Sequence, residues 1–321
     1  MKRMFGQLSS QTRSGYSVYD NVMTETPHSP NALPQSGRQS VIDCLEAAVR
    51  EAGLRLESVS EAPSCLFIRE HGGRLLGMFV DGALPLNTSD TIALMKDKRH
   101  TNRAVEALRI PKGPRVPRYM PYSNPIAGER PFGTLPDIES VVADIEGRFG
   151  YPVIVKPNTG SVSRHVFKAT SRGELAGGVE AIFAHADGSE DCLIAQEYLE
   201  FEHEYRGIFV HGELVMLYEK TDSAAPGVRG GGPLEWSDVM DQLVADPVIW
   251  DHLKEAFAPV LSGLRIEYTG ADIGVMADGS VYLIELNSNP RFSRVLKNTG
   301  SAGQNALKAV FLKVLERVQS R

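Results

Sequence analysis

Residues 270–293 read GADIGVMADGSVYLIELNSNPRFS, and this stretch decides how we expect the chain to fold. Two alternating apolar runs, 273–276 and 281–286, flank the tetrapeptide Ala-Asp-Gly-Ser. An Asp-Gly pair favours the positive backbone angles of a tight hairpin turn. The sequence therefore predicts that the two runs form paired antiparallel strands.

This pairing would bring oxygen-bearing side chains together. It places Asp272, at the start of the first strand, beside Glu285 and Asn287, at the end of the second. Glu285 and Asn287 are two residues apart, so the period of a strand points both side chains to one face. Carboxylate and amide oxygens with room for water and phosphate suit Mg²⁺. We interpret the three residues as a magnesium-nucleotide site; the alternative is a hairpin whose acids face water.

The composition is that of an ordinary globular chain. Its 321 residues, 42% of them hydrophobic, are enough for two or three domains. No apolar run approaches the roughly 18 residues that span a bilayer, and the first residues lack the apolar segment of a signal peptide. Cys44, Cys65 and Cys192 have no paired spacing, so neither a disulfide framework nor a zinc site is indicated. We expect a cytoplasmic protein without a membrane partner.

The charge pattern argues against nucleic acid as the main partner. The net charge is -6 and the isoelectric point is near 5.8. Lys and Arg are scattered along the chain, whereas a nucleic-acid site requires a basic cluster. Individual cations therefore matter more here than their sum.

The rest of the chain is expected to alternate helices with short strands. Residues 1–37 are polar, lack apolar periodicity and are interpreted as a loop or arm. Apolar residues at helical spacing predict helices at 40–52, 86–103, 136–149, 172–184, 246–264 and 302–318. Short apolar runs predict strands at 64–68, 75–80, 152–157, 192–199, 205–210 and 214–220. Seven prolines in 109–136 exclude a long helix there, so this segment is expected to be a connector.

Lys156 ends the apolar strand predicted at 152–157. It follows Val-Ile-Val and precedes a small-residue loop that contains Ser161 and Ser163. A lysine that emerges from so apolar a strand calls for an anionic partner. Backbone N–H groups of a loop rich in Gly and Ser can hold anionic oxygens. The segment predicts a phosphate site; the alternative is a plain surface turn.

Polar groups also end the strand predicted at 192–199. The backbone beside Gln196 to Leu199 can read the edge of adenine, and the carboxylate of Glu204 can accept from both ribose hydroxyls. Glu204 and Arg206 have the same parity on the following strand, so both should point to one face. The alternative is that Glu197 and Glu204 are simply solvated.

These residues together resemble the ATP-grasp superfamily of carboxylate-amine ligases, from about Leu86 to the C-terminus. Asp97-Lys98, followed by a Thr and Pro111, resembles the entry motif of the family. Val155-Lys156-Pro157 and the loop after it resemble the phosphate-covering hairpin. Asp272, Glu285 and Asn287 match the magnesium ligands, spaced thirteen and two apart as in D-alanine–D-alanine ligases.

Other segments are most similar to the ligase domain of cyanophycin synthetases and to related glutathione synthetase modules. They are residues 86–89, 205–210 and 228–232. The resemblance implies an α/β chain with the ATP-grasp fold. Residues 1–95 would form a small N-terminal α/β domain with its polar arm. Residues 96–197 and 198–321 would form two α+β subdomains that clamp ATP between them.

The resemblance also implies a reaction. ATP activates a carboxylate as an acyl phosphate, and an amine then attacks it to give an amide, ADP and phosphate, with amino acids or small peptides as substrates. The implied cofactors are ATP and Mg²⁺, for which Mn²⁺ can substitute. The implied cofactor-binding residues are Lys98, Lys156, Ser161, Ser163, Gln196, Glu197, Tyr198, Leu199 and Glu204. The implied metal ligands are Asp272, Glu285 and Asn287, and we assign Arg206, Lys220 and Arg291 to catalysis.

Two further features concern the substrate. Arg291 and Arg294 directly follow the metal ligands, and their planar forks can hold a carboxylate or the transferring phosphate; a surface role is the alternative for Arg294. Residues 224–233 are rich in Gly and basic, and are interpreted as a substrate loop.

One departure from the family concerns the covering loop. Ser163 and His165 stand where related ligases usually carry glycines, which predicts a stiffer loop. The sequence leaves two other functions open: a small-molecule kinase on the same fold and a non-catalytic nucleotide-binding subunit. It also leaves open that the chain forms a homodimer.

Overall fold

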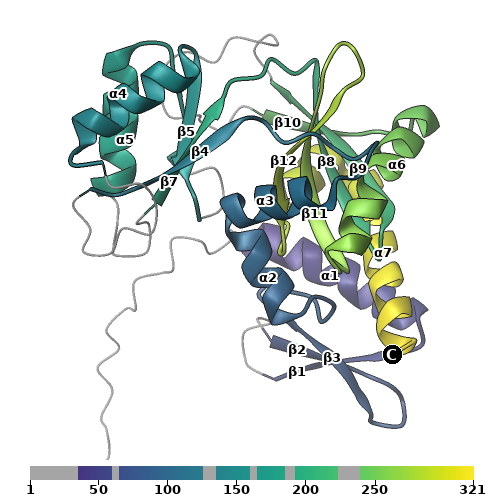
Figure 1. Ribbon diagram of the computed structural model, residues 1–321. Helices are drawn as coiled ribbons and strands as arrows, with labels where there is room; N and C mark the ends of the chain where they lie inside the picture. The colour runs from purple at the N-terminus through teal and green to yellow at the C-terminus, as the bar shows by residue number, and fades with distance from the viewer. Residues whose placement is uncertain (1–34, 60–64, 126–134, 160–164, 185–191, 223–238) are drawn as a thin grey trace, which may run out of the picture. The chain divides into compact units, whose positions relative to one another are not determined.

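The computed structural model of the chain describes residues 35–59, 65–125, 135–159, 165–184, 192–222 and 239–321 (Figure 1). The expected arm within 1–37, Ser161 and Ser163, and the loop 224–233 lie wholly or mostly outside these residues. The described part mixes helices with three antiparallel sheets, as the sequence predicts. None of the helices in these ranges combines the length and the apolar character that crossing a bilayer requires.

The first unit of structure is a helix over a three-stranded sheet. Helix α1 (Gln35–Glu51) precedes β1 (Arg55–Ser58), β2 (Cys65–Arg69) and β3 (Leu75–Val80), which pair in that order. Gly53, with a φ of 66°, follows the helix. A left-handed residue just past a helix is the usual C-terminal stop, which favours glycine. The helix and the strands β2 and β3 agree with the sequence prediction.

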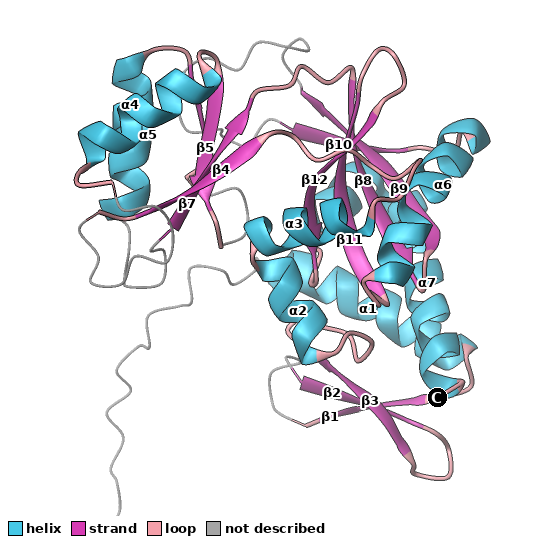
Figure 2. Ribbon diagram, in the orientation of Figure 1, coloured by secondary structure: helices cyan, strands magenta, loops and turns pink. Residues whose placement is uncertain are grey.

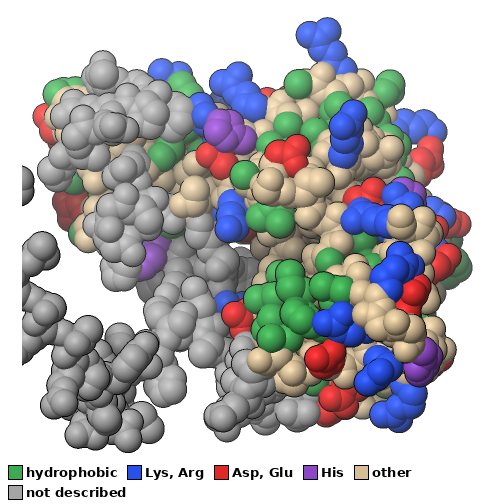
Figure 3. Space-filling model, turned by 90° about the horizontal axis from the view of Figure 1, so that it is seen from below, with side chains coloured by type: hydrophobic (Ala, Val, Ile, Leu, Met, Phe, Trp, Pro, Cys, Tyr) green, Lys and Arg blue, Asp and Glu red, His purple; other side chains and the backbone are tan. Residues whose placement is uncertain are grey.

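The three-stranded sheet buries one face and exposes the other. Leu66, Ile68 and Phe79 point into the core, whereas Met78 and Val80 are 46% and 39% exposed. A period of two explains this alternation. Figure 3 looks onto this end of the chain and shows apolar side chains gathered among charged ones.

The second sheet has four strands in the order β4-β7-β5-β6. Its strands are β4 (Tyr119–Ser123), β5 (Val153–Pro157), β6 (Phe167–Ala169) and β7 (Cys192–Glu197). Helices α4 (Ile138–Phe149) and α5 (Arg172–Ala184) pack on one face of it (Figure 2), over a core that includes Val153, Val155 and Ala195. Residues that alternate with these, Lys156 among them, therefore face the other side.

Strand β4 was not predicted, because it lies within the proline-rich connector. Pro121 is its central residue, and β4 is the edge strand of its sheet. An edge strand tolerates proline because one of its sides needs no ladder hydrogen bond. The prolines exclude a helix here, as predicted, but they do not exclude an edge strand.

The third sheet has five strands in the order β10-β9-β8-β11-β12. They are β8 (His203–Val210), β9 (Glu213–Asp222), β10 (Val239–Leu243), β11 (Tyr268–Val275) and β12 (Val281–Asn287). Strands β11 and β12 are the hairpin predicted from the opening stretch, and they pair Asp272 with Glu285 and Gly270 with Asn287. Strand β10 was not predicted.

Helices cover both faces of this sheet. Helix α6 (Pro247–Gly263) packs on one face, together with residues of α2 (Ser89–Lys96) and α3 (Lys98–Leu108) such as Met95 and Val105. Helix α7 (Ser293–Gln319) packs on the other and is interrupted at Gly300. The expected helix at 86–103 is in fact two helices, because Asp97 ends α2 and caps α3.

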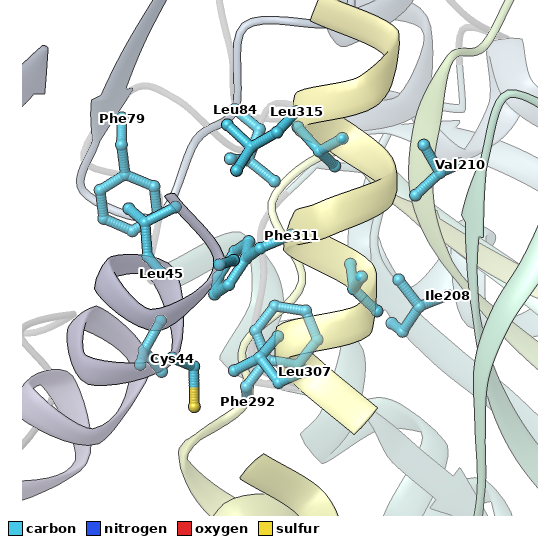
Figure 4. Close-up of a cluster of buried hydrophobic side chains, with 14 of the residues drawn as sticks. Cys44, Leu45, Phe79, Leu84, Ile208, Val210, Phe292, Leu307, Phe311 and Leu315 are labelled. Atoms are coloured by element: carbon cyan, nitrogen blue, oxygen red, sulfur yellow. The ribbon is translucent and has the colours of Figure 1, made fainter. Parts of the chain in front are cut away.

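The largest core lies where α7 packs between α1 and the five-stranded sheet (Figure 4). Phe311 on α7 is 1% exposed and meets the ring of Phe79 edge-on, with a centroid distance of 6.4 Å. Ile208 and Val210 of β8 line the sheet side of the same core. Helix α7 therefore joins the N-terminal sheet to the five-stranded sheet.

We predict that Phe311→Ala lowers the free energy of unfolding by about 3–5 kcal/mol, since it leaves a cavity in a packed core. Urea denaturation followed by circular dichroism measures this change. Val248→Ala is the matched control, because Val248 is 73% exposed. A loss of less than about 1 kcal/mol for Phe311→Ala would contradict the packing described for α7.

Candidate functional site

Asp272 lies at the centre of the candidate site. Its strand, β11, runs between β8 and β12, and its residue partners are Arg206 on one side and Glu285 on the other. Paired residues of antiparallel strands point to the same face. The side chains of all three residues therefore emerge together, as the hairpin predicts for Asp272 and Glu285.

Two cations hold the Asp272 carboxylate. Arg206 donates from Nε to Oδ1 and from Nη2 to Oδ2, the latter at 2.6 Å, and Lys220 Nζ donates to Oδ1 at 2.7 Å. Burial alone would raise the pKa of Asp272, but the charges of Arg206 and Lys220 outweigh it and hold that pKa well below its usual range. Asp272 is therefore ionised at neutral pH and fixed by a fork and a lysine.

Glu285 faces a third cation. Lys98, the first residue of α3, has its Nζ 3.6 Å from Glu285 Oε1. The Lys98 side chain is 9% exposed and that of Glu285 is 23% exposed. The pair is thus mostly shielded from solvent, and it brings the start of α3 to the end of β12.

Lys156 lies near the same charges. It is 5% exposed, and burial, together with the charge of Lys98, lowers its pKa to about 8, against the opposing effect of Glu285 and Asp272. Among the described residues no carboxylate forms an ion pair with it. Lys98 and Lys156, which are 58 residues apart in the sequence, therefore meet as the sequence predicts.

The donor set fits a hard cation. Asn287 Nδ2 donates to Gly270 O at 3.4 Å, which directs the other amide atom, an oxygen, away from that strand. Asp272 Oδ2 accepts one hydrogen bond and keeps a further lone pair. Within the described ranges no three His, Cys, Asp or Glu side chains cluster, so a cation here would use the amide as well as the two acids. This is the oxygen set that Mg²⁺ prefers.

Glu204 shares the face of these residues. It lies on β8 two residues before Arg206, it is half-buried, and its charge acts to raise the pKa of Lys220 against the lowering effect of burial. The parity argument for Glu204 and Arg206 is therefore confirmed. Arg206 and Lys220, assigned to catalysis from the sequence, both bind the Asp272 carboxylate.

Glu197 has a partner that the sequence did not reveal. Its Oε1 accepts from the backbone N–H of Arg118 at 2.6 Å, and Arg118 Nε lies 3.8 Å from Oε2. The carboxylate thus ties the end of β7 to the connector before β4. The sequence predicts a cofactor-binding residue here, with a solvated side chain as the alternative. The side chain is 31% exposed and binds the Arg118 backbone.

The neighbours of Glu197 lie around the same strand end. Gln196 is buried and pairs with Ile154 of β5, two residues before Lys156. Tyr198 and Leu199 are half-buried, and Lys168 Nζ lies 3.8 Å from the centre of the Tyr198 ring. Lys168 was missed in the sequence, although it also pairs with Ile154 and so shares its face.

The two arginines after the metal trio differ. Arg291 is exposed in the loop between β12 and α7. Arg294 uses its fork on the buried Asp241 of β10, with both hydrogen bonds at 2.8 Å. The Arg294 side chain is 35% exposed, and its fork is directed at Asp241 in this structure. No sequence pattern near Asp241 indicated this pair.

Sequence comparisons give no match: no family model matches the chain, and no curated protein matches it. Comparison with solved structures does. The D-alanine–D-alanine ligase of Bacillus anthracis is 16% identical, with a TM-score of 0.51 over 72% of this chain and 70% of that one. VanG, the D-Ala:D-Ser ligase of Enterococcus faecalis, is 18% identical, with a TM-score of 0.52 over 72% of this chain and 62% of that one.

At these identities the likeness concerns the fold alone. It confirms the mixed α/β architecture that the motifs predict. The chain therefore has the ATP-grasp fold, in the form found in D-alanine–D-alanine ligases.

Proposed function

We propose that this chain is an ATP-dependent carboxylate-amine ligase that acts on amino acids or small peptides and releases ADP and phosphate. The observation that carries the proposal is that, among the described residues, buried cations outnumber the carboxylates beside them. Lys98, Lys156, Arg206 and Lys220 gather around Asp272 and Glu285. Buried charge must be paired, so such a site favours a polyanion such as a triphosphate.

The lysines support the phosphoryl-transfer step. Phosphoryl transfer needs mainly positioning and electrostatic stabilisation of charge on the phosphate oxygens. Lys98 and Lys156 come from different elements, α3 and β5, and converge with little exposure to water. At low effective dielectric their charges act more strongly on a phosphate than they would at the surface.

The trio of Asp272, Glu285 and Asn287 would hold the magnesium ion. When bound there, Mg²⁺ supplies positive charge that stabilises the phosphate oxygens. Glu285, which is partly exposed and only 3.6 Å from Lys98, can bind the ion while Lys98 turns to a phosphate. Asp272 keeps one lone pair on Oδ2 for this purpose while Arg206 and Lys220 fix its orientation.

Arg206, Lys220 and Arg291 would act on the substrate. In acyl transfer the oxygen of the attacked carbonyl gains negative charge, and nearby donors lower the barrier. Arg206 Nη1 is a further donor beyond the two nitrogens that bind Asp272. The two structurally similar ligases are named for the amino acids alanine and serine, which supports amino acids as the substrate class.

A cytoplasmic location, the domain boundaries and a homodimer stay predictions from the sequence.

The reaction is tested by incubating the protein with ATP, Mg²⁺, single amino acids and hydroxylamine. An acyl phosphate reacts with hydroxylamine to give a hydroxamate, so we expect hydroxamate and phosphate to form together when the correct amino acid is present. ADP release with phosphate on a hydroxyl and no hydroxamate would indicate a kinase instead. No ADP release with any amino acid or dipeptide would contradict the ligase.

We predict that the two acids differ in their effect on stability although both are needed for turnover. Asp272→Asn leaves Arg206 and Lys220 buried beside a neutral side chain, which costs about 3–5 kcal/mol. Glu285→Gln acts on a carboxylate that is 23% exposed and 3.6 Å from a single cation, so it should cost less stability than Asp272→Asn. Both variants should lose at least about 100-fold in turnover.

Urea denaturation and the hydroxamate assay measure the two effects on the same preparations. Asp278→Asn is the control, because Asp278 lies in the hairpin turn between the same strands and bonds only within that turn. Normal turnover in Glu285→Gln would remove the metal assignment. Equal stability of Asp272→Asn and the unchanged chain would contradict the buried cluster.

A further inference from the structure

Asn158 lies between the two lysines and contacts the elements that carry both. It follows Pro157 at the end of β5, two residues after Lys156, and is 4% exposed. Its backbone N–H donates to Cys192 O of β7 at 3.0 Å, which extends the sheet ladder by one residue. Its backbone is therefore fixed by the four-stranded sheet.

The other polar groups of Asn158 cap α3. Its backbone oxygen accepts from the N–H of Lys98 at 3.1 Å, and its Oδ1 accepts from the N–H of Arg99 at 3.1 Å. The next N–H, of His100, donates to Asp97 Oδ1 at 2.7 Å. The first N–H groups of a helix have no partner within the helix. Here Asn158, which directly follows β5 of the four-stranded sheet, accepts from two of them.

A fourth bond closes the arrangement. Asn158 Nδ2 donates to Asp97 Oδ2 at 2.9 Å, so the residue that caps α3 locally is itself held by Asn158. Both ends of the amide are used, one as acceptor and one as donor. Aspartate at this position would lack the donor and would place a second carboxylate against Asp97. Only an amide of this length provides both bonds from this backbone position.

We propose that Asn158 is a positioning residue that sets the placement of Lys98 relative to Lys156 for binding of a nucleoside triphosphate. Lys98 begins α3, and α3 packs through Val105 into the core of the five-stranded sheet. Lys156 belongs to the four-stranded sheet. Asn158 joins these two parts at the point where their lysines meet. The inference rests on the proposed nucleotide site.

The test measures binding of AMP-PNP with Mg²⁺ by isothermal titration calorimetry. A displacement of about 1 Å in a positioned group can cost about 100-fold, so Asn158→Ala should weaken binding by about 10- to 100-fold. Asn124→Ala is the matched control. Asn124 is also a buried asparagine that directly follows a strand of the four-stranded sheet, and its Nδ2 donates to Phe183 O. It should bind AMP-PNP like the unchanged chain.

A double-mutant cycle separates positioning from a general structural role. If Asn158 acts through Lys98, its effect must vanish once Lys98 is removed. Asn158→Ala should therefore weaken binding in the unchanged chain but leave it unaltered within error in a Lys98→Met background. Equal losses in the two backgrounds would overturn the inference, since a structural defect does not depend on Lys98.

Asp97→Ser provides a second variant in case Asn158→Ala does not fold. Serine keeps the local helix cap but cannot bond Asn158 and His100 at once, so it loosens the link and leaves Asn158 in place. It should also weaken binding by about tenfold. If the unchanged chain binds AMP-PNP and the Asn158→Ala and Asp97→Ser variants bind it as tightly, the inference is wrong but the proposed function stands. If the unchanged chain does not bind AMP-PNP, the proposed function fails and the inference with it.

Discussion

Surplus positive charge in a shielded site is the constraint on which the other features of this protein depend. Asp272 binds both Arg206 and Lys220, and Glu285 stands opposite Lys98. Lys156 has no ion-pair partner among the described residues. Burial, together with the charge of Lys98, lowers the pKa of Lys156 to about 8. A folded chain tolerates such a deficit where a ligand supplies the missing negative charge.

The fold creates this site by register and by helix capping. Three neighbouring strands, β8, β11 and β12, place Arg206, Asp272 and Glu285 side by side. The start of α3 then brings Lys98 to Glu285, and Asn158 holds that start against the end of β5. The core between α1, the sheet and α7 continues on the same face, because Ile208 and Val210 follow Arg206 on β8 with the same parity. The charged site and this core therefore share one face of the sheet, and the core that contains Phe209 and Ile273 lies on the other face.

The features that the sequence predicted are local. The hairpin at 270–293 could be found because alternation and Asp-Gly act over a few residues, and the convergence of Asp272 with Glu285 follows from strand pairing alone. The helices at 136–149 and 172–184 also follow from spacing of apolar residues. Lys156 was recognised because a charge at the end of an apolar strand is unusual.

The features that the sequence did not predict depend on distant partners. Glu197 accepts from the backbone N–H of Arg118, and Arg294 donates to Asp241. Asp241 lies on β10, whose sequence shows no strong apolar alternation. Strand β4 forms although it contains proline, because its position at a sheet edge is a property of the whole sheet. Asn158 looks like an ordinary turn residue until α3 is placed against it. The spacing of residues in the sequence does not predict such contacts between distant residues.

The most direct test of the charge deficit is proton uptake when Mg²⁺ and AMP-PNP bind near pH 9. The ligand-free Lys156 has a pKa of about 8 and is mostly neutral there, whereas a bound triphosphate favours the protonated form. Binding should therefore take up close to one proton and weaken as the pH rises above about 8. Calorimetry in two buffers of different ionisation enthalpy measures this. Lys156→Arg, which stays charged, should bind without that uptake; equal uptake in both proteins, or none in the unchanged chain, would contradict the account.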